Sequence, residues 1–235
     1  KTMIVFTSDH GMAFAGGKTT VYEGGLKVPF IVRNPYEKKR GVKQSGLISH
    51  IDITPSLLDF AGALDHEKNR PKIWHSPEKY WKDKPYVAKE NTGASSKLSA
   101  YHGKSWLSIL GDPAKKHWNE IFASHTFHEI QMYYPMRVIR DDQYKLIWNI
   151  AHPLPYPFAS DLWAASSFQA QYQKSMSAPY GQKTVRDYIH RPEFEFYKID
   201  QDPHEAYNLV GNSKYSETLD VYKKKLKSAQ SKFHD

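Results

Sequence analysis

The chain has no cysteine among its 235 residues. Disulfide bonds, cysteine metal sites and a thiol nucleophile are therefore excluded for these residues. No apolar run approaches the roughly 18 residues of a membrane-spanning helix, so we expect no membrane span. A secretory signal peptide is not recognisable either, and localisation is left open by that route.

The charge balance is basic, but it is not concentrated in one segment. The formal net charge is +8, which favours anionic partners such as a sulfated polysaccharide, an anionic membrane or a nucleic acid. The basic residues occur in short clusters such as Lys38–Arg40 and Lys223–Lys225, which we expect to be solvated. A hydrophobic share of 40% is typical of a globular protein and excludes a disordered chain.

The first quarter of the chain predicts the end of a large mixed or parallel α/β sheet. Four continuous apolar residues, Met3–Phe6, suit a strand that is buried on both faces, as in a parallel sheet with flanking helices. We expect a second strand at Val28–Arg33, and a helix that begins at Thr54 and stops at Gly62. The polar residues 65–100 predict either a long loop over the active face or an insertion.

Strand patterns return after about residue 120. Period-2 alternation predicts several strands, and the helical spacing of apolar residues predicts a C-terminal helix. The predicted strands are 121–124, 136–140, 144–150 and 194–199, and the helix is 216–233. We therefore predict a smaller antiparallel sheet with a terminal helix, and two domains, residues 1–125 and 126–235.

Asp9 and His10 follow the first predicted strand, at the edge where open α/β sheets bind ligands. A carboxylate oxygen and an imidazole nitrogen on adjacent residues can share one divalent ion. Gly11 then allows a sharp backbone turn. Taken alone the pair is weak evidence, because Asp-His pairs also occur in caps and turns.

Gly16-Gly17-Lys18-Thr19 invites comparison with a phosphate-binding loop. A Walker A loop needs another glycine five residues before its second one, and that position is Met12. It also needs a helix after the lysine, which Tyr22-Glu23-Gly24-Gly25 does not predict. We reject the Walker loop. Lys18 remains either a surface lysine or a cation on a glycine-rich loop that neutralises an anionic oxygen.

Four ordered groups of residues strengthen the interpretation of Asp9 and His10 as a site. They are Ser-Asp-His-Gly at 8–11 with Gly-Lys-Thr-Thr-Val-Tyr-Glu-Gly-Gly-Leu-Lys-Val-Pro-Phe-Ile-Val at 17–32, Asp-Ile-Thr-Pro-Ser-Leu-Leu at 52–58, Gly-Lys-Ser at 103–105, and Asp-Pro-His-Glu-Ala-Tyr-Asn-Leu at 202–209. Together they resemble the sulfatase family of the alkaline phosphatase superfamily over about residues 3–210. His128-Glu129, followed by Tyr-Pro-Met-Arg at 134–137, resembles more narrowly the sulfamidase branch, which acts on N-sulfated glucosamine of heparan-type saccharides.

The resemblance implies a metal-dependent hydrolase of sulfuric esters or sulfamates. Asp9 and His10 match metal ligands, for Ca²⁺ or another divalent ion, and Lys18 matches the residue that contacts the substrate's sulfate. His128 and Glu129 are expected to bind the sugar, although a turn with a packed histidine is an equally good interpretation. The sulfamidase branch has Asn at the position of His10 and Arg at that of Lys18. His10 leaves room for a softer metal than Ca²⁺, and Lys18 lacks the bidentate fork of arginine.

The nucleophile that the family uses is missing from this sequence. Sulfatases use a formylglycine made from Cys or Ser in a Cys/Ser-x-Pro-x-Arg motif, and no such motif is present. The resemblance therefore implies that the formylglycine, the other metal ligands and the leaving-group acid lie upstream, in an N-terminal half that completes the catalytic domain. It also implies a sulfated saccharide substrate, no nucleic-acid partner and an extracytoplasmic location, and it allows a homodimer.

Other functions remain open at this point. An O-sulfatase on another sulfated sugar fits the family equally well, and a phosphonate or phosphodiester hydrolase of the superfamily would share the Asp-His pair with Mn²⁺ or Zn²⁺. A non-catalytic polyanion-binding module would explain the net charge alone. We expect four aromatic residues to pack in the core rather than line a saccharide cleft: Trp163, Phe168, Tyr172 and Tyr180.

Overall fold

The computed structural model describes residues 2–62, 64, 102–130 and 132–233. The predicted loop or insertion at 65–100 lies outside these residues. The chain divides into two compact units, one formed by residues 1–35 with 118–235 and the other by residues 36–117, and each is described by itself. The predicted domain boundary near residue 125 stays a prediction. No helix in the described ranges is long and apolar enough to cross a membrane.

The first unit begins with strand β1 (Ile4–Thr7), the one-turn helix α1 (Glu23–Leu26) and strand β2 (Phe30–Arg33). β1 pairs antiparallel with β2, and Ile4 and Phe6 are exposed. The prediction of a doubly buried strand in a parallel pairing is therefore wrong for this pair. The Gly11 N–H donates to the Gly25 carbonyl at 3.0 Å, so the intervening loop is pinned at its ends and the chain returns in the reverse direction.

Helix α1 corrects a second prediction, because the segment with two glycines at 22–25 does form one helical turn. The carboxylate of Glu23 explains why. It accepts a bidentate pair of bonds from Arg140, at 3.0 and 3.1 Å, and lies 3.2 Å from the buried ammonium of Lys145. These contacts outweigh the low helix propensity of glycine.

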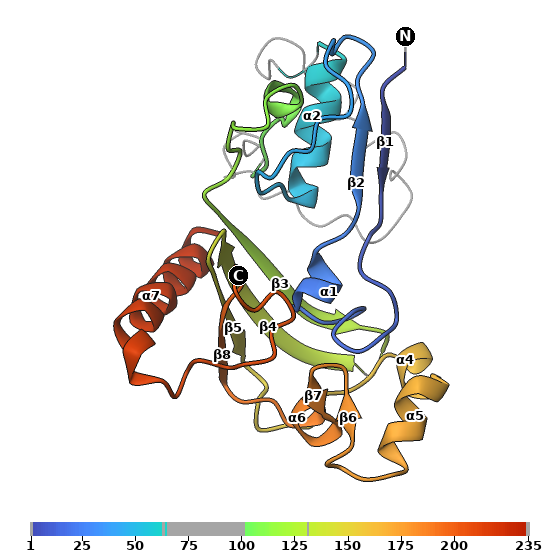
Figure 1. The fold of residues 1–235 in the computed structure, drawn as a ribbon, viewed down its shortest axis with the longest axis vertical. Helices are drawn as coiled ribbons and strands as arrows, with labels where there is room; N and C mark the ends of the chain where they lie inside the picture. Colours follow the sequence, from blue (N-terminus) through green and yellow to red (C-terminus); the bar gives the residue numbers. More distant parts are fainter. Residues whose placement is uncertain (1, 63, 65–101, 131, 234–235) are drawn as a thin grey trace, which may run out of the picture. The chain divides into compact units, whose positions relative to one another are not determined.

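The larger sheet of this unit has the strand order β3-β4-β5-β8, with every neighbouring pair antiparallel (Figure 1). The strands are β3 (Glu120–His128), β4 (Met132–Asp141), β5 (Tyr144–Asn149) and β8 (Phe194–Lys198). The Asp141 carboxylate closes the turn between β4 and β5, because it accepts bonds from the Gln143 and Tyr144 N–H groups at 2.8 Å. The predicted hairpin and antiparallel sheet are confirmed.

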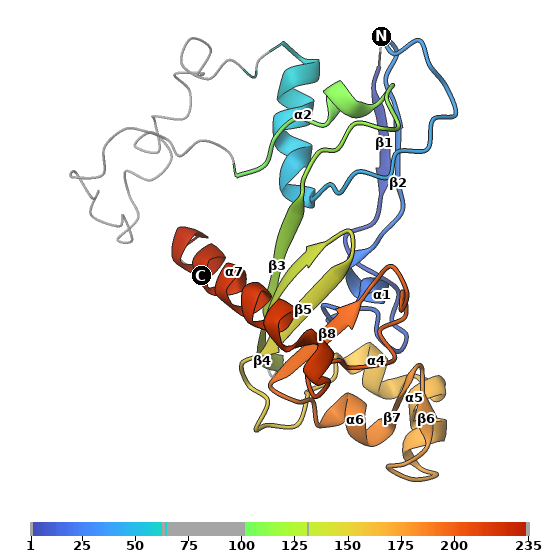
Figure 2. The ribbon, with the colours of Figure 1, turned by 60° about the vertical axis from the view of Figure 1, so that its left-hand side comes forward.

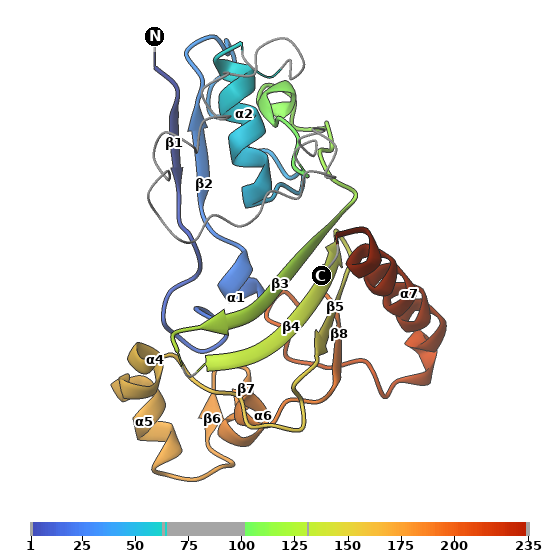
Figure 3. The same cartoon turned by 180° about the vertical axis from the view of Figure 1, so that it is seen from behind.

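Helices cover both faces of this sheet (Figures 2 and 3). Helix α7 (Ser216–Phe233) packs Leu219, Tyr222 and Leu226 on one face, as the helical spacing predicts. The other face carries α4 (Ser160–Ala164), α5 (Ser166–Tyr172), the strands β6 (Pro179–Tyr180) and β7 (Lys183–Thr184), and α6 (Val185–Ile189). Phe168 and Tyr180 are buried in that second core, which confirms the prediction for these two residues. Trp163 and Tyr172 are 45% and 39% exposed, so the prediction of core packing is wrong for them; they lie at the solvent edge of the core and contact Phe168 with their rings.

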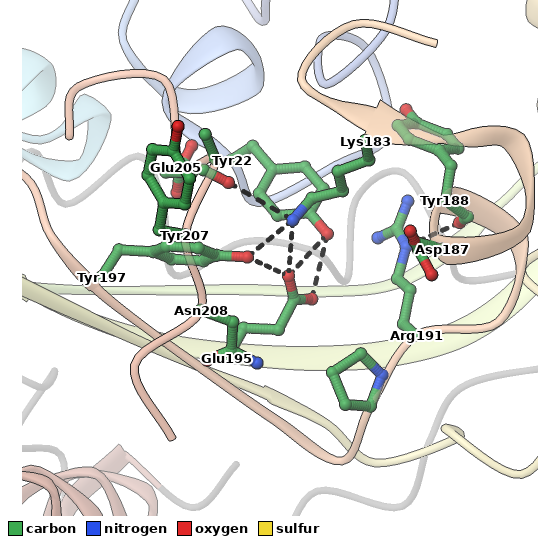
Figure 4. Close-up of polar contacts among 12 residues, drawn as sticks. Tyr22, Lys183, Asp187, Tyr188, Arg191, Glu195, Tyr197, Glu205, Tyr207 and Asn208 are labelled. Carbon is green, nitrogen blue, oxygen red and sulfur yellow. Dashed lines mark hydrogen bonds and ion pairs between the residues drawn. The ribbon is translucent and has the colours of Figure 1, made fainter. Parts of the chain in front are cut away.

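A buried polar network ties the chain around α1 to the sheet (Figure 4). The hydroxyl of Tyr22 donates to both oxygens of the Glu195 carboxylate at 2.9 Å, and the Asn149 amide donates to the same carboxylate at 2.8 Å. The ammonium of Lys183 lies 3.3 Å from Glu195, whose side chain is 2% exposed. Burial opposes ionisation of Glu195, but Lys183 and Arg191 hold its pKa below the ordinary value.

The second unit is organised around the buried carboxylate of Asp52. It contains the 3-10 turn His50–Asp52, helix α2 (Ile53–Phe60) and the 3-10 turn Leu107–Ile109. Asp52 accepts bonds from the Ser49 and Lys104 N–H groups at 2.8 and 2.9 Å, so it joins the segments around 52–58 and 103–105 that the sequence singles out. Gly62 follows the helix with a φ of 68°, which glycine adopts without strain.

Candidate functional site

Asp9 and His10 lie directly after β1 and face solvent. The Asp9 carboxylate accepts the His10 N–H at 2.9 Å and lies 3.4 Å from the His10 ring. The backbone bond from His10 is the largest cause that lowers the Asp9 pKa below its ordinary value. Asp9 is 82% exposed and His10 44%, so both side chains are accessible to an ion.

The chemistry of this pair fits a divalent ion, but the pair is not a complete site. A carboxylate oxygen and an imidazole nitrogen are normal ligands of Ca²⁺, Mn²⁺ and Zn²⁺ sites. Within the described residues, no group of three or more His, Asp or Glu side chains is placed to hold a metal. Asp9 and His10 would therefore supply part of a coordination shell.

The loop between β1 and α1 folds back so that the backbone of Lys18 contacts that of Met12. The Lys18 N–H donates to the Met12 carbonyl at 2.9 Å, two residues after His10. Such tight folding requires glycine. A Cβ atom on Gly11 would lie 1.7 Å from the Gly24 carbonyl oxygen, and one on Gly17 would lie 2.0 Å from that of Met12. The glycines of the sequence pattern thus allow backbone-to-backbone contact.

Gly11→Ala is expected to destabilise the intact protein by about 1–3 kcal/mol, because two backbone segments must separate to admit the methyl group. Thermal unfolding checks this result. Gly211→Ala is the matched control, since nothing lies within 4 Å of a Cβ atom at that position. Equal unfolding temperatures for the two variants would contradict the close packing.

Two tyrosines from the second half of the unit anchor the backbone on both sides of Lys18. The Gly16 N–H donates to the Tyr188 hydroxyl at 3.1 Å. The Tyr156 hydroxyl donates to the Thr19 carbonyl at 2.7 Å and lies 2.8 Å from the Thr19 hydroxyl. Thr19 has a φ of 62°, which is costly for a β-branched residue and which these two bonds maintain.

The ammonium of Lys18 contacts Asp161 on α4. The Lys18 Nζ lies 2.6 Å from Asp161 Oδ2, and the two side chains are 18% and 48% exposed. The hydrogen bond from Lys18 is the main cause that lowers the Asp161 pKa. Ion pairs with this exposure contribute only about 0.2–1 kcal/mol, so an incoming anion can compete for the ammonium.

Glu129 contacts the residue next to Asp161. The Glu129 carboxylate accepts the Ser160 hydroxyl at 2.9 Å and the Ser160 N–H at 3.3 Å. His128, the last residue of β3, lies 3.7 Å from the same carboxylate. Glu129 has a φ of 54°, an uncommon conformation for a non-glycine residue.

The structure thus brings Lys18, His128 and Glu129 around the first turn of α4, while Asp9 and His10 contact each other beside the same loop. Sequence reasoning does not identify Ser160 and Asp161. No motif marks them, and Asp161 meets Lys18 only because the chain folds back after 143 residues.

The family comparison covers the segment that carries Asp9, His10 and Lys18. The family model described as Sulfatase matches residues 1–63, which include β1, the glycine-rich loop, β2 and α2. This part of the chain is therefore similar to the sulfatase family.

Two curated proteins are similar in sequence to this chain over most of its length. The chain is 30% identical to human N-sulphoglucosamine sulphohydrolase over 237 aligned positions, which cover all of this chain and 42% of that protein. It is 25% identical to an ulvan-active sulfatase of Formosa agariphila, covering 91% of this chain and 34% of the relative. The chain thus spans less than half the length of these relatives.

Solved structures show the same fold over almost the whole chain. A protein in complex with its substrate D-glucosamine-2-N,6-O-disulfate superposes with a TM-score of 0.60 at 20% identity, covering 99% of this chain and 35% of that one. A 2-O glycosaminoglycan sulfatase gives 0.58 at 18% identity, covering 99% and 37%. The phosphonate monoester hydrolase of Agrobacterium radiobacter gives 0.53 at 18%, covering 98% and 35%. The predicted fold class is confirmed.

Proposed function

We propose that this chain is the C-terminal part of a sulfatase that hydrolyses the N-sulfate of glucosamine in heparin- or heparan-type saccharides. One observation carries the proposal. Lys18, His128 and Glu129 converge around one turn of α4 in a chain that aligns over its whole length with an N-sulphoglucosamine sulphohydrolase. The basic net charge of +8 suits a polyanionic substrate.

Each candidate site residue has a proposed role. Asp9 and His10 would hold a divalent ion, Ca²⁺ or a softer metal, which supplies positive charge to sulfate oxygens. Lys18 would donate to another sulfate oxygen from a backbone fixed by Tyr156 and Tyr188. His128 and Glu129 would bind sugar hydroxyl groups near that sulfate.

The rest of the machinery is proposed to lie outside this chain. The described residues hold two candidate ligands but no group of three, and the chain spans 42% of its human relative. We therefore assign the remaining ligands, the leaving-group acid and a formylglycine, whose hydrated aldehyde would attack sulfur, to the N-terminal half of the protein. An extracytoplasmic location and a homodimer stay predictions.

Sulfate release from a set of disaccharides tests the proposal. The intact, metal-loaded protein is incubated with N-sulfated, 6-O-sulfated and 2-O-sulfated disaccharides and with a phosphonate ester. We expect sulfate release from the N-sulfated sugar alone, and a loss of at least about 100-fold in Lys18→Ala, because a donor to the developing charge is removed. Lys27→Ala serves as the matched control, since Lys27 lies in the same segment beyond α1.

The other outcomes identify the alternatives. Release from an O-sulfated sugar only would keep the sulfatase and reject the N-sulfatase. Turnover of the phosphonate ester alone would make the protein a phosphonate hydrolase. Salt-sensitive binding of heparin without any turnover would favour a polyanion-binding module.

A further inference from the structure

We infer that Asp161 is a specificity-determining residue, whose carboxylate favours an amine leaving group over an alcohol leaving group. This inference rests on the proposed function of the site around Lys18. It concerns a residue that no motif marks and that the structure places in direct contact with the proposed sulfate-binding cation, 2.6 Å from Lys18 Nζ.

The backbone at Asp161 is held from both sides. On one side, Ser160 donates its hydroxyl and its N–H to Glu129. On the other side, Leu162 is completely buried in the core that covers the sheet. Because both neighbours are fixed, the backbone keeps the Asp161 side chain within reach of the Lys18 ammonium.

The charges around Lys18 do not suit a sulfate group alone. The Lys18 ammonium lies 2.6 Å from the Asp161 carboxylate. A carboxylate beside the lysine weakens its attraction for a bare anion. A substrate that carries a hydrogen-bond donor or a positive charge next to its sulfate would offset this effect.

A sulfamate is such a substrate. In the overall reaction R–NH–SO₃⁻ + H₂O → R–NH₃⁺ + SO₄²⁻, the S–N bond breaks, a new S–O bond forms, and the nitrogen gains two hydrogens and a positive charge. The nitrogen is bonded to the sulfur whose oxygen would contact Lys18, so in the proposed binding mode it would lie near Asp161. A sulfate ester has no hydrogen on its bridging oxygen and releases a neutral alcohol, which can donate one hydrogen bond to a neighbouring carboxylate but has no positive charge to pair with it.

Lysine is suited to serve both groups. Its ammonium has three N–H donors, so one can remain on Asp161 while the others bind sulfate oxygens. The amine would then form next to an acceptor that is already in place, which requires no rearrangement during the reaction.

The test uses Asp161→Asn in the intact, metal-loaded protein, because asparagine keeps the shape and removes the charge. We expect kcat/KM for the N-sulfated disaccharide to fall at least about tenfold. Competitive inhibition by inorganic sulfate should stay equal or become tighter, because Lys18 loses a competing anion. Asp220→Asn, at an exposed position on α7, is the matched control and should change neither value.

Each remaining outcome overturns a stated claim. If the variant loses sulfate inhibition in proportion to kcat/KM, Asp161 only supports Lys18, and the inference fails while the proposed function stands. If the variant keeps full kcat/KM on the N-sulfated sugar, the inference also fails alone. If the wild-type protein releases no sulfate from that sugar, the proposed function fails and the inference fails with it.

Discussion

Asp9→Ala is expected to abolish metal binding in the intact protein and to lower sulfate release by at least about 100-fold. Asp9 lies at the end of β1 beside His10, with its side chain open to solvent. Without it, the proposed divalent ion would lose a hard oxygen ligand, and the sulfate oxygens would lose the positive charge that the ion would supply. Metal content by mass spectrometry and sulfate release from the N-sulfated disaccharide check the two parts separately.

A second variant and a chelator make this prediction specific. His10→Asn replaces the imidazole by an amide oxygen, so we expect the metal to be retained and the preference to shift toward Ca²⁺. Removal of the metal with a chelator should inactivate the wild-type protein, and added metal should restore it. An Asp9→Ala protein with full metal content would place the ion elsewhere and remove Asp9 from the site.

The sequence identifies the residues of this site better than it identifies their partners. Lys18 stands out through the ordered motifs and Glu129 through a looser resemblance, and both signals are local in sequence. Asp161 has no motif, and it becomes relevant only when tertiary folding places it against Lys18. The same holds for Glu23. Its segment does not predict a helix from sequence, and the contacts with Arg140 and Lys145 that stabilise the helical turn arise only in the folded structure.

The antiparallel pairing of β1 with β2 could not be predicted from the sequence for a related reason. The apolar run at Met3–Phe6 predicts a strand, and β1 is one, but such a run does not specify how its neighbour is oriented. The orientation depends on the loop, which closes through the contact of Gly11 with Gly25. The later strands were easier to predict, because short connections such as that between β4 and β5 force an antiparallel pairing.

Glu195→Ala is expected to destabilise the protein by about 3–5 kcal/mol, the largest stability effect that we predict for a single side chain. Its carboxylate is the shared acceptor of Tyr22, Asn149 and Tyr197 and lies beside Lys183 (Figure 4). The alanine variant leaves the ammonium of Lys183 and several buried donors without this acceptor. For a folding unit of roughly 150–250 residues, such a loss corresponds to a fall in unfolding temperature of roughly 10 °C.

The pH dependence of stability distinguishes the charge of Glu195 from its shape. The folded-state pKa of Glu195 is lowered, so its stabilisation is present above the unfolded value of about 4.3 and is lost as the pH falls through the folded value. The advantage of the wild-type protein over Glu195→Gln should therefore be constant near neutral pH and shrink below about pH 4.

Glu217→Ala, at an exposed position on α7, is the matched control for Glu195→Ala. If the two variants unfold at the same temperature, the network does not hold the Tyr22 segment on the sheet. The positioning of the Lys18 loop must then come from Tyr156 and Tyr188 alone.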